Sequence, residues 1–463
     1  MQGSRATRVL AVLLLGGACL PLTAPAAPAP PPAAAVAPTA PPPPPPPATA
    51  GSGDEISLAA FLAEVAAANL DYAAARFNVP IAEAQLTAAR VSPNPQLTVG
   101  TSGRDLTDRA EQREPANNDA GIAQTIELGG KRGKRVAVAR ANLAQAAATL
   151  EDFFRTLRAN AATAFVDALT KRRIAEEKQR SAATLDQLVD ANRKRLEVGD
   201  IGEIDLTQSK VDAQQFRAEY LAARSDAQVA AIGLEQQLGR RIAPGAAGQA
   251  HALRQVVPVG SLEGPARSFD PAALLAAAVQ HRPDVIAARH ALESARASVQ
   301  VAWAMAVPDA NLSFTYQDNE RSHNAIAPAP AFSSIGLSVG FSLPIFNRFR
   351  GELEAARQTA GQAEATLHGV ELRAQVEVRQ ALARYQLANE RAAQFQGGLL
   401  DDAAAVFKAK LFSYEHGASS LLDVLNAQRA EDDIRLAYLD ALDERAKALI
   451  GVEQAAGTWN VDL

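Results

Sequence analysis

One stretch decides the fold of this chain: Ser334-Ile335-Gly336-Leu337-Ser338-Val339-Gly340-Phe341-Ser342-Leu343. Apolar and small polar residues alternate through it without a miss. Successive side chains of a β-strand point to opposite faces of the sheet, so the alternation predicts a strand with one apolar and one polar face. A tilted strand of about ten residues spans a bilayer, and the pattern is typical of an outer-membrane barrel strand. A half-buried strand of a soluble sandwich alternates in the same way, so the rest of the chain has to decide between the two.

The remainder of the sequence favours the membrane strand. A second alternating segment lies just upstream, in which Leu312, Phe314 and Tyr316 interleave with Ser313, Thr315 and Gln317. Almost everything else is long, Ala-rich helix, and hydrophobic residues make up 48% of the 463 residues while aromatic residues make up only 5%. This composition suits long helices that pack closely along small side chains, and not one large globular core.

Charge and residue chemistry exclude several classes of protein. The formal net charge is −5, and without residues 1–26 there are 44 basic against 51 acidic residues, a net charge of −7. An acidic chain disfavours nucleic acid as a partner. Cys19 is the single cysteine, so no intramolecular disulfide can form. The six histidines lack ligand spacing, and no nucleophile–base or paired-carboxylate constellation stands out. We therefore predict no enzyme activity, no metal site and no cofactor.

The N-terminus has the pattern of an export signal at residues 1–26, with basic residues ahead of a short apolar core. Two processing sites are compatible with it. Ala24-Pro25-Ala26 fits ordinary signal peptidase, whereas Gly17-Ala18-Cys19 resembles a lipoprotein box and would leave Cys19 as a lipidated N-terminus. Residues 27–54 are rich in Pro and Ala and are predicted to form a disordered linker.

The chain repeats itself at a period of roughly 215 residues. The segment from Asp71 to Arg76 matches the segment from Asp284 to Arg289, and Leu196-Glu197-Val198-Gly199 matches Tyr414-Glu415-His416-Gly417. Asp205 and Asp423 follow those glycines at the same distance. We predict two repeats, 55–238 and 269–456, with a linker at 239–268 between them and a tail at 457–463.

Each repeat is predicted to contain the same elements in the same order. A helix leads to two strands, a very long helix follows, and a Gly-containing break precedes a return helix. In the first repeat these elements lie at about 57–91, 96–101, 121–128, 133–197 and up to Leu238. In the second they lie at about 271–306, 311–317, 334–343, 351–414 and up to Ala455. A helix of roughly 65 residues reaches about 100 Å, a length that suggests coiled-coil packing.

Four strands per chain are too few for a closed membrane barrel, which needs about eight. An open sheet cannot sit in lipid, because the backbone groups of its edge strands would be unpaired there. The barrel must therefore be shared between chains, and three chains would supply about twelve strands. Two-fold and four-fold assembly are not excluded by counting alone. The predicted fold class is α+β membrane: a four-stranded contribution to a trimeric, 12-stranded outer-membrane β-barrel, continued by a long periplasmic α-helical barrel.

This plan resembles the trimeric outer-membrane channels of the TolC family. The resemblance covers about residue 55 to the C-terminus. Its most specific motif consists of Tyr414, Gly417 and the segment Ser420-Leu421-Leu422-Asp423-Val424-Leu425-Asn426-Ala427-Gln428. Ser92-Pro93-Asn94-Pro95 and Arg282-Pro283-Asp284 carry it further. Within the family, the segments 124–132 and 343–348 look most like the cobalt–zinc–cadmium branch, which serves heavy-metal efflux.

The resemblance implies roles for single residues. The two Gly-to-Asp segments would be the periplasmic tips of helical hairpins, which dock on an adaptor protein and close the tunnel. Asp423 matches an aspartate of the family's constriction, while Asn426 stands where a second one is expected. A ring of Asp423 residues would favour cations, and a cap within the hairpin tip is the other interpretation of Asp423. The candidate residues are Asp423, Asn426 and Asp205 for the constriction, and Gly199, Gly417, Tyr414, Ser420, Leu421 and Leu422 for docking.

Three functions stay open from the sequence. The first is the outer-membrane exit duct of a tripartite resistance–nodulation–division pump that exports heavy-metal cations, with a homotrimer, a periplasmic adaptor, an inner-membrane pump and outer-membrane lipid as partners. The second is the same duct for drugs or type I protein secretion. The third is a periplasmic coiled-coil structural protein without a channel.

Overall fold

The computed structural model describes residues 54–102, 117–239, 256–321 and 330–461. The predicted export signal, Cys19 and all of the predicted linker at 27–54 except its last residue lie outside these described residues.

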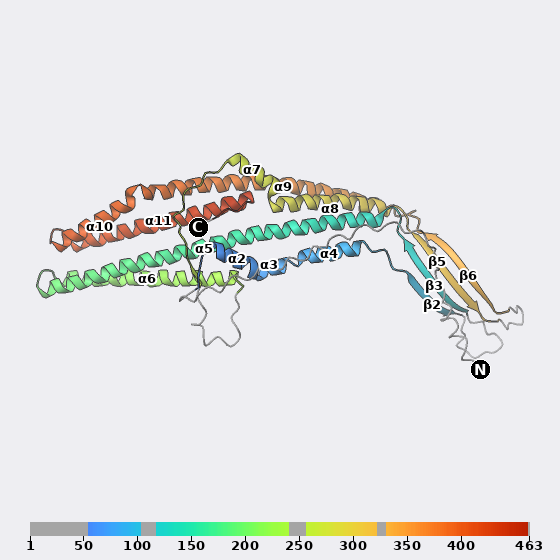
Figure 1. Ribbon diagram of the computed structural model, residues 1–463, viewed down its shortest axis with the longest axis horizontal. Coiled ribbons are helices and arrows are strands. Elements are labelled where there is room, and N and C mark those ends of the chain that lie inside the picture. The colour runs from blue at the N-terminus through green and yellow to red at the C-terminus, as the bar shows by residue number, and fades with distance from the viewer. Residues whose placement is uncertain (1–53, 103–116, 240–255, 322–329, 462–463) are drawn as a thin grey trace, which may run out of the picture. The chain divides into compact units, whose positions relative to one another are not determined.

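Four strands form one antiparallel sheet in the order β2-β3-β5-β6, and Figure 1 shows them side by side. The strands are β2 (Gln96–Ser102), β3 (Asn117–Ile126), β5 (Ala310–Asn319) and β6 (Phe332–Phe341). Strands from both halves of the chain meet at the centre of the sheet, where β3 pairs with β5. The outer edges of the sheet are β2 and β6.

The sheet has one apolar and one polar face, as the alternation predicts. Leu97, Ile122, Phe314 and Leu337 lie directly opposite one another across the four strands. All four are exposed, with Leu97 at 68% and Leu337 at 73% of full exposure.

The other face of the sheet is lined with hydroxyl, amide and glycine residues. The hydroxyls of Ser313 and Ser338 are 2.7 Å apart, and Thr125 Oγ1 donates to Asn311 Oδ1 at 2.8 Å. The sheet therefore leaves a wide apolar surface uncovered on one side and pairs polar side chains on the other.

Several strand boundaries differ from the prediction because the partner strand sets the extent of pairing. The last residue of β6 is Phe341 and not Leu343, since Phe341 pairs with Ala310, the first residue of β5. Pro308 precedes Ala310 and disfavours further ladder pairing. For the same reason β3 ends at Ile126 and not at residue 128, and it begins at Asn117 because β5 extends to Asn319 opposite it.

The first half of the chain contains five helices among the described residues. They are α2 (Leu58–Ala68), α3 (Leu70–Ala75), α4 (Asn78–Ala89), α5 (Lys131–Glu197) and α6 (Glu203–Gln237). The prediction of one helix over 57–91 is wrong, because the backbone of Asn69 is extended and its Oδ1 accepts a hydrogen bond from Tyr72 N at 2.9 Å. Asn69 thus caps a new helix where the sequence suggested continuation.

The second half of the chain has a similar order with two further breaks. Its helices are α7 (Pro271–His281), α8 (Pro283–Met305), α9 (Arg350–Gln394), the π-helical turn η2 (Phe395–Leu399), α10 (Leu400–Glu415) and α11 (Leu421–Ala456). Pro283 forces Arg282 into an extended conformation and so divides the helix predicted over 271–306. Gly398, at φ 110°, divides the helix predicted over 351–414.

The long helices form a layer in which α5 is central. It packs against α4, α6, α8 and α11, while α9 packs against α8 and α11. A core in the middle of the helices surrounds Phe61 and Phe165, whose ring centroids are 5.5 Å apart. Taken singly, none of the described helices is both long and apolar enough to cross a membrane; only the bent pair Leu58–Ala68 and Leu70–Ala89 reaches that length and composition jointly.

A small parallel sheet that the sequence analysis did not predict closes this core. It joins β1 (Asp54–Ile56), which begins in the predicted linker at 27–54, to β4 (Val256–Pro258), which lies in the predicted linker at 239–268. Val256 is buried in the core beside Phe165. Strands of three residues are too short to produce a detectable period, so only the tertiary contact reveals them.

The two return helices end in matching ways. Asn69 Nδ2 donates to Gln237 O at 3.0 Å at the end of α6, and Arg282 Nη1 donates to Ala455 O at 3.1 Å at the end of α11. A glycine with positive φ follows each helix, Gly239 at 63° and Gly457 at 75°. Each side chain therefore caps the carbonyl end of a return helix that lies further along the chain, 168 residues away for Asn69 and 173 residues away for Arg282.

Arg282 is also buried at the centre of a charge cluster whose acidic members are partly exposed. Its side chain is 2% exposed and donates to both carboxylate oxygens of Asp284, at 2.9 and 2.7 Å, and to Glu377 Oε2 at 2.7 Å. Burial would raise the pKa of Asp284, but the hydrogen bonds and charge of Arg282 outweigh it and lower that pKa. The cluster joins α8, α9 and the end of α11.

We predict that Gly239→Ala destabilises the protein more than Gly199→Ala. Both glycines have positive φ, so both substitutions carry a backbone cost of about 1–2 kcal/mol. A Cβ at Gly239 would also lie 2.3 Å from Ala68 O, whereas a Cβ at Gly199 meets nothing within 4 Å. Thermal unfolding of both variants measures the difference. Equal midpoints would show that the contact between the helix end and Ala68 is unimportant.

Candidate functional site

The two hairpin tips are built alike, as the sequence match between them predicts. In the first hairpin, formed by α5 and α6, Gly199 lies at φ 76° and Asp200 N donates to Arg195 O at 2.8 Å. In the second hairpin, formed by α10 and α11, Gly417 lies at φ 72° and Ala418 N donates to Ser413 O at 2.7 Å. Both are Schellman turns, which require a left-handed residue where each glycine stands.

Asp423 caps the N-terminus of α11. Its Oδ2 accepts hydrogen bonds from Ser420 N at 3.2 Å and Ser420 Oγ at 2.9 Å, and Ser420 Oγ accepts from Asp423 N at 3.2 Å. Lys410 Nζ lies 3.9 Å from Asp423 Oδ1. The hydrogen bonds from Ser420 and then the charge of Lys410 lower the pKa of Asp423, so it is a carboxylate at neutral pH. The cap interpretation is therefore confirmed, and the side chain remains 47% exposed.

Asp205 is the counterpart of Asp423 in the first tip. Its Oδ2 accepts a hydrogen bond from Gly202 N at 3.4 Å, but Gly202 has no side chain to complete the reciprocal bond. The remaining predicted tip residues divide by exposure. Leu422 and Asn426 are exposed, whereas Tyr414 and Leu421 are each only 6% exposed and belong to the core between the hairpins.

Tyr414 connects the two hairpins. Its hydroxyl donates to Asn192 Oδ1 at 2.9 Å, and its ring lies 4.8 Å from the guanidinium carbon of Arg195. Arg195 Nη1 donates to Tyr414 O at 3.2 Å, and Arg195 Nε donates to Asp200 Oδ2 at 2.9 Å. The sequence predicts Tyr414 as a tip residue, whereas Arg195 is not among the predicted site residues. A basic residue in the last turn of α5 was the signal that could have found it.

A cavity of about 120 Å³ lies beside this contact, between α5 and α10. Asn192 lines it, is fully buried, and has an Nδ2 without a hydrogen-bond partner among the described residues. A buried donor without a partner costs free energy. Among the described residues, the hydrogen bond from the Tyr414 hydroxyl is the only one that the Asn192 side chain makes.

A second buried polar group lies between α5 and α11. Asp432 Oδ1 accepts hydrogen bonds from Ser181 Oγ and, at 3.2 Å, from Gln428 Nε2. Asp432 Oδ2 and Gln428 Oε1 are buried and have no partner among the described residues. Burial raises the pKa of Asp432; the Ser181 hydrogen bond and the charge of Lys178 oppose the rise, while Glu431 adds to it.

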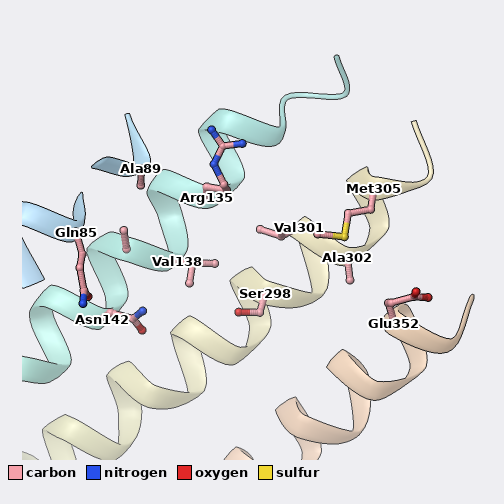
Figure 2. A pocket seen from close by; sticks show the side chains of 11 residues that line it. Gln85, Ala89, Arg135, Val138, Asn142, Ser298, Val301, Ala302, Met305 and Glu352 are labelled. Carbon is pink, nitrogen blue, oxygen red and sulfur yellow. The ribbon is translucent and has the colours of Figure 1, made fainter. Parts of the chain in front are cut away.

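A larger pocket of about 500 Å³ lies near the sheet, between α4, α5, α8 and α9. Figure 2 shows Ser298 and Val301 of α8 pointing toward the part of α5 that carries Val138 and Asn142. The lining is largely apolar. Around it and elsewhere in the described ranges, no group of His, Cys, Asp and Glu side chains is arranged to hold a metal ion.

Three comparisons relate this geometry to known proteins. The profile of the family described as Outer membrane efflux protein matches residues 61–240 and 274–458. The cobalt-zinc-cadmium resistance protein CzcC of Cupriavidus metallidurans is 27% identical over 407 residues, which cover 87% of this chain and 90% of CzcC. The pyoverdine export outer membrane protein OpmQ of Pseudomonas putida is 29% identical over 421 residues, covering 84% of each protein. A crystal structure of CusC has a TM-score of 0.71 at 20% identity, over 89% of this chain and 95% of CusC, and shares the fold.

We predict that Tyr414→Phe lowers the stability of the paired hairpins by about 1–3 kcal/mol, because it leaves the buried Asn192 side chain without a hydrogen bond to any described residue. Replacing both partners by apolar residues removes the unpaired group, so Tyr414→Phe combined with Asn192→Leu should recover most of the loss. Thermal unfolding of the two single variants and the double variant tests this. Additive losses in the double variant would contradict it.

Stability near Asp432 should depend on pH. Its pKa is raised in the folded protein, so the folded state binds the proton more tightly than the unfolded chain. The stabilisation is complete below the unfolded pKa and is lost as pH rises through the folded pKa. Asp432→Asn, whose amide can donate to Gln428 Oε1, should unfold at a higher temperature than the wild type above neutral pH and show a flatter pH dependence. Asp433→Asn, at the exposed next residue, is the control, and equal pH profiles for all three proteins would contradict the prediction.

Proposed function

Because this chain belongs to the outer membrane efflux protein family, we propose that it is the exit duct of a three-part resistance–nodulation–division pump that exports heavy-metal cations. Membership in a family of efflux channels agrees with the prediction that the chain is not an enzyme. The energy for transport would come from an inner-membrane pump, and a periplasmic adaptor would connect that pump to this duct.

The exposed apolar face of the sheet supports insertion in the outer membrane. Leu97 and Leu337 mark its two edge strands, and β2 and β6 would leave backbone groups unpaired in lipid. In the order β2-β3-β5-β6, β6 of one copy can pair with β2 of the next in antiparallel fashion. We propose a homotrimer with a shared barrel of about twelve strands, the same assembly as predicted from the sequence.

The helices would then continue the barrel into the periplasm. The hairpin tips would lie at the far end, where Gly199, Gly417, Ser420 and Leu422 are available to an adaptor, while the buried Tyr414 and Leu421 support the tip from within. A ring of Asp423 carboxylates around the three-fold axis is compatible with its exposure and its lowered pKa, and would favour cations. Asn426 and Asp205 complete the proposed constriction.

Several features of the sequence extend this proposal. The matching ends of α6 and α11 support an ancestral duplication with repeats at 55–238 and 269–456, joined at 239–268 and followed by the tail at 457–463. The proposal also keeps the export signal at 1–26 and the disordered Pro- and Ala-rich linker predicted at 27–54. Lipidation of Cys19 is one of its two processing outcomes.

The proposal that the cargo is a heavy-metal cation rests on the similarity to CzcC, a cobalt-zinc-cadmium resistance protein. OpmQ is a pyoverdine export protein of comparable similarity, so an organic cargo is the second candidate. A duct for drugs or for type I protein secretion belongs to the same candidate. No metal cluster is needed in the chain for either cargo, because a duct conducts its cargo without retaining it.

The test is the tolerance profile of a strain that lacks this gene, over zinc, cadmium, cobalt, nickel, copper and silver, and over drugs and bile salts. We expect selective metal sensitivity that the intact gene restores. Gly417→Val should assemble but fail to restore tolerance, because a β-branched residue resists the left-handed turn that the tip requires.

Drug or detergent sensitivity with normal metal tolerance would overturn the metal cargo and favour the organic one. Single-channel recording in planar bilayers separates both from a coiled-coil structural protein. Discrete conductance steps are expected from the purified trimer, and their absence would contradict the duct itself.

A further inference from the structure

The segments that join the sheet to the helices are basic in a chain that is acidic as a whole. They are residues 90–92, 127–135, 307–309 and 344–352, where the strands meet α4, α5, α8 and α9 (Figure 1). They contain seven Lys and Arg residues and three acidic residues, so they carry four excess positive charges while the whole chain carries −5. We name the basic residues the basic collar; they are Arg90, Lys131, Arg132, Lys134, Arg135, Arg348 and Arg350.

Two members of the collar are held by ion pairs within the protein. Lys131 Nζ lies 2.7 Å from Asp309 Oδ1, and Arg135 is paired with Glu127. Asp309 Oδ1 also accepts from Leu128 N at 3.0 Å. These pairs fasten the start of α5 to the ends of β3 and β5, so their charges are already neutralised.

The other five members have no acidic partner among the described residues. Arg132 Nη1 donates only to the neutral Ser92 Oγ, at 3.1 Å, and Lys134 Nζ lies 4.6 Å from the ring centroid of Trp303. Arg90, Arg348 and Arg350 are exposed. Their positive charge is therefore available to a partner outside the chain.

Large apolar side chains accompany these cations. Phe346 is fully exposed, Ile345 is 63% exposed and Trp303 is 57% exposed. Leu343, two residues beyond the end of β6 and two before Ile345, is also 67% exposed. Aromatic residues beside Lys and Arg at the edge of an apolar band are typical of the protein surface that contacts lipid headgroups.

We propose that the basic collar binds the phosphate groups of anionic phospholipids, of which phosphatidylglycerol is the representative, in the leaflet next to the helices. This inference rests on the proposed function, since it requires the apolar face of the sheet to lie in lipid. Guanidinium and ammonium groups donate charge-assisted hydrogen bonds to phosphate oxygens. The paired residues Lys131 and Arg135 would hold the junction rigid, while the five unpaired cations select the lipid.

Trp303 provides a probe at the collar itself. The protein would be reconstituted in vesicles with Trp459→Phe as background, so that Trp303 is the single tryptophan. Its fluorescence is measured as phosphatidylglycerol or phosphatidylcholine, each brominated near the headgroup, replaces the unlabelled phosphatidylcholine. We expect half-maximal quenching of Trp303 at a mole fraction of brominated phosphatidylglycerol that is about fivefold lower than that of brominated phosphatidylcholine.

The test variant changes Arg132, Lys134, Arg348 and Arg350 to Gln together, leaving Arg90 as the C-cap of α4. It should be quenched equally by both lipids. A matched variant changes four exposed basic residues of the hairpins that have no described ion pair, Lys194, Lys210, Arg224 and Lys408, to Gln and should keep the preference.

The outcomes separate this inference from the proposed function. Equal quenching of the wild type by both lipids would overturn the lipid selection and leave membrane insertion intact. If both four-residue variants lost the preference for phosphatidylglycerol, the effect would come from net charge, and the proposed role of the basic collar would be wrong. If neither lipid quenched Trp303, the junction between sheet and helices would not lie at the membrane surface. Both the proposed duct function and this inference would then be wrong.

Discussion

The open edges of the four-stranded sheet are the constraint on which the rest of this structure depends. The apolar face that contains Leu97 and Leu337 is stable only against lipid or another apolar surface, and lipid offers no partner for the backbone groups of β2 and β6. Closure with other copies, as proposed, would meet both demands. The register also places Ile126, Ala310 and Phe341 level with one another, so α5, α8 and α9 leave the sheet from the same end and must continue as a layer.

The helices of this layer pack largely through small alanine side chains. Polar contacts between them therefore specify how the helices align. Alanine packing allows close approach but fixes the register weakly, whereas a buried polar pair fits only one register. The Tyr414 hydroxyl on Asn192 aligns the two hairpins, and Arg282 with Asp284 and Glu377 aligns the helices nearer the sheet. Buried polar groups carry a local cost: Asn192 Nδ2, and Asp432 Oδ2 between α5 and α11, have no hydrogen-bond partner among the described residues. The helical part is therefore held in register by a few polar contacts at separate heights.

The sequence could predict those features that have a long period or a fixed turn chemistry. The alternation at 334–343 identified the two-faced sheet, and Gly199 and Gly417 identified the reversals of the hairpins because only a left-handed residue closes a Schellman turn. The breaks at Asn69 and Gly398 were missed, since each interrupts an otherwise continuous helical pattern. β1 and β4 were missed because their pairing depends on distant contacts. The place of Arg195 in the last turn of α5 is a local signal, but its contact with Tyr414 depends on the approach of a second hairpin.

The distribution of charge along the chain can be compared with the proposed export of cations. The tip segments 197–205 and 415–423 contain six Asp and Glu residues and no Lys or Arg, while the basic collar has the opposite sign. An acidic entrance raises the local concentration of cations, but a basic ring within the same tunnel would repel them before they leave. The two charges are compatible with a duct for metal cations when the collar faces anionic headgroups outside the barrel wall, where lipid phosphates neutralise it. The small and polar residues on the other face of the sheet, such as Ser313 and Ser338, then leave the lumen without a cationic barrier.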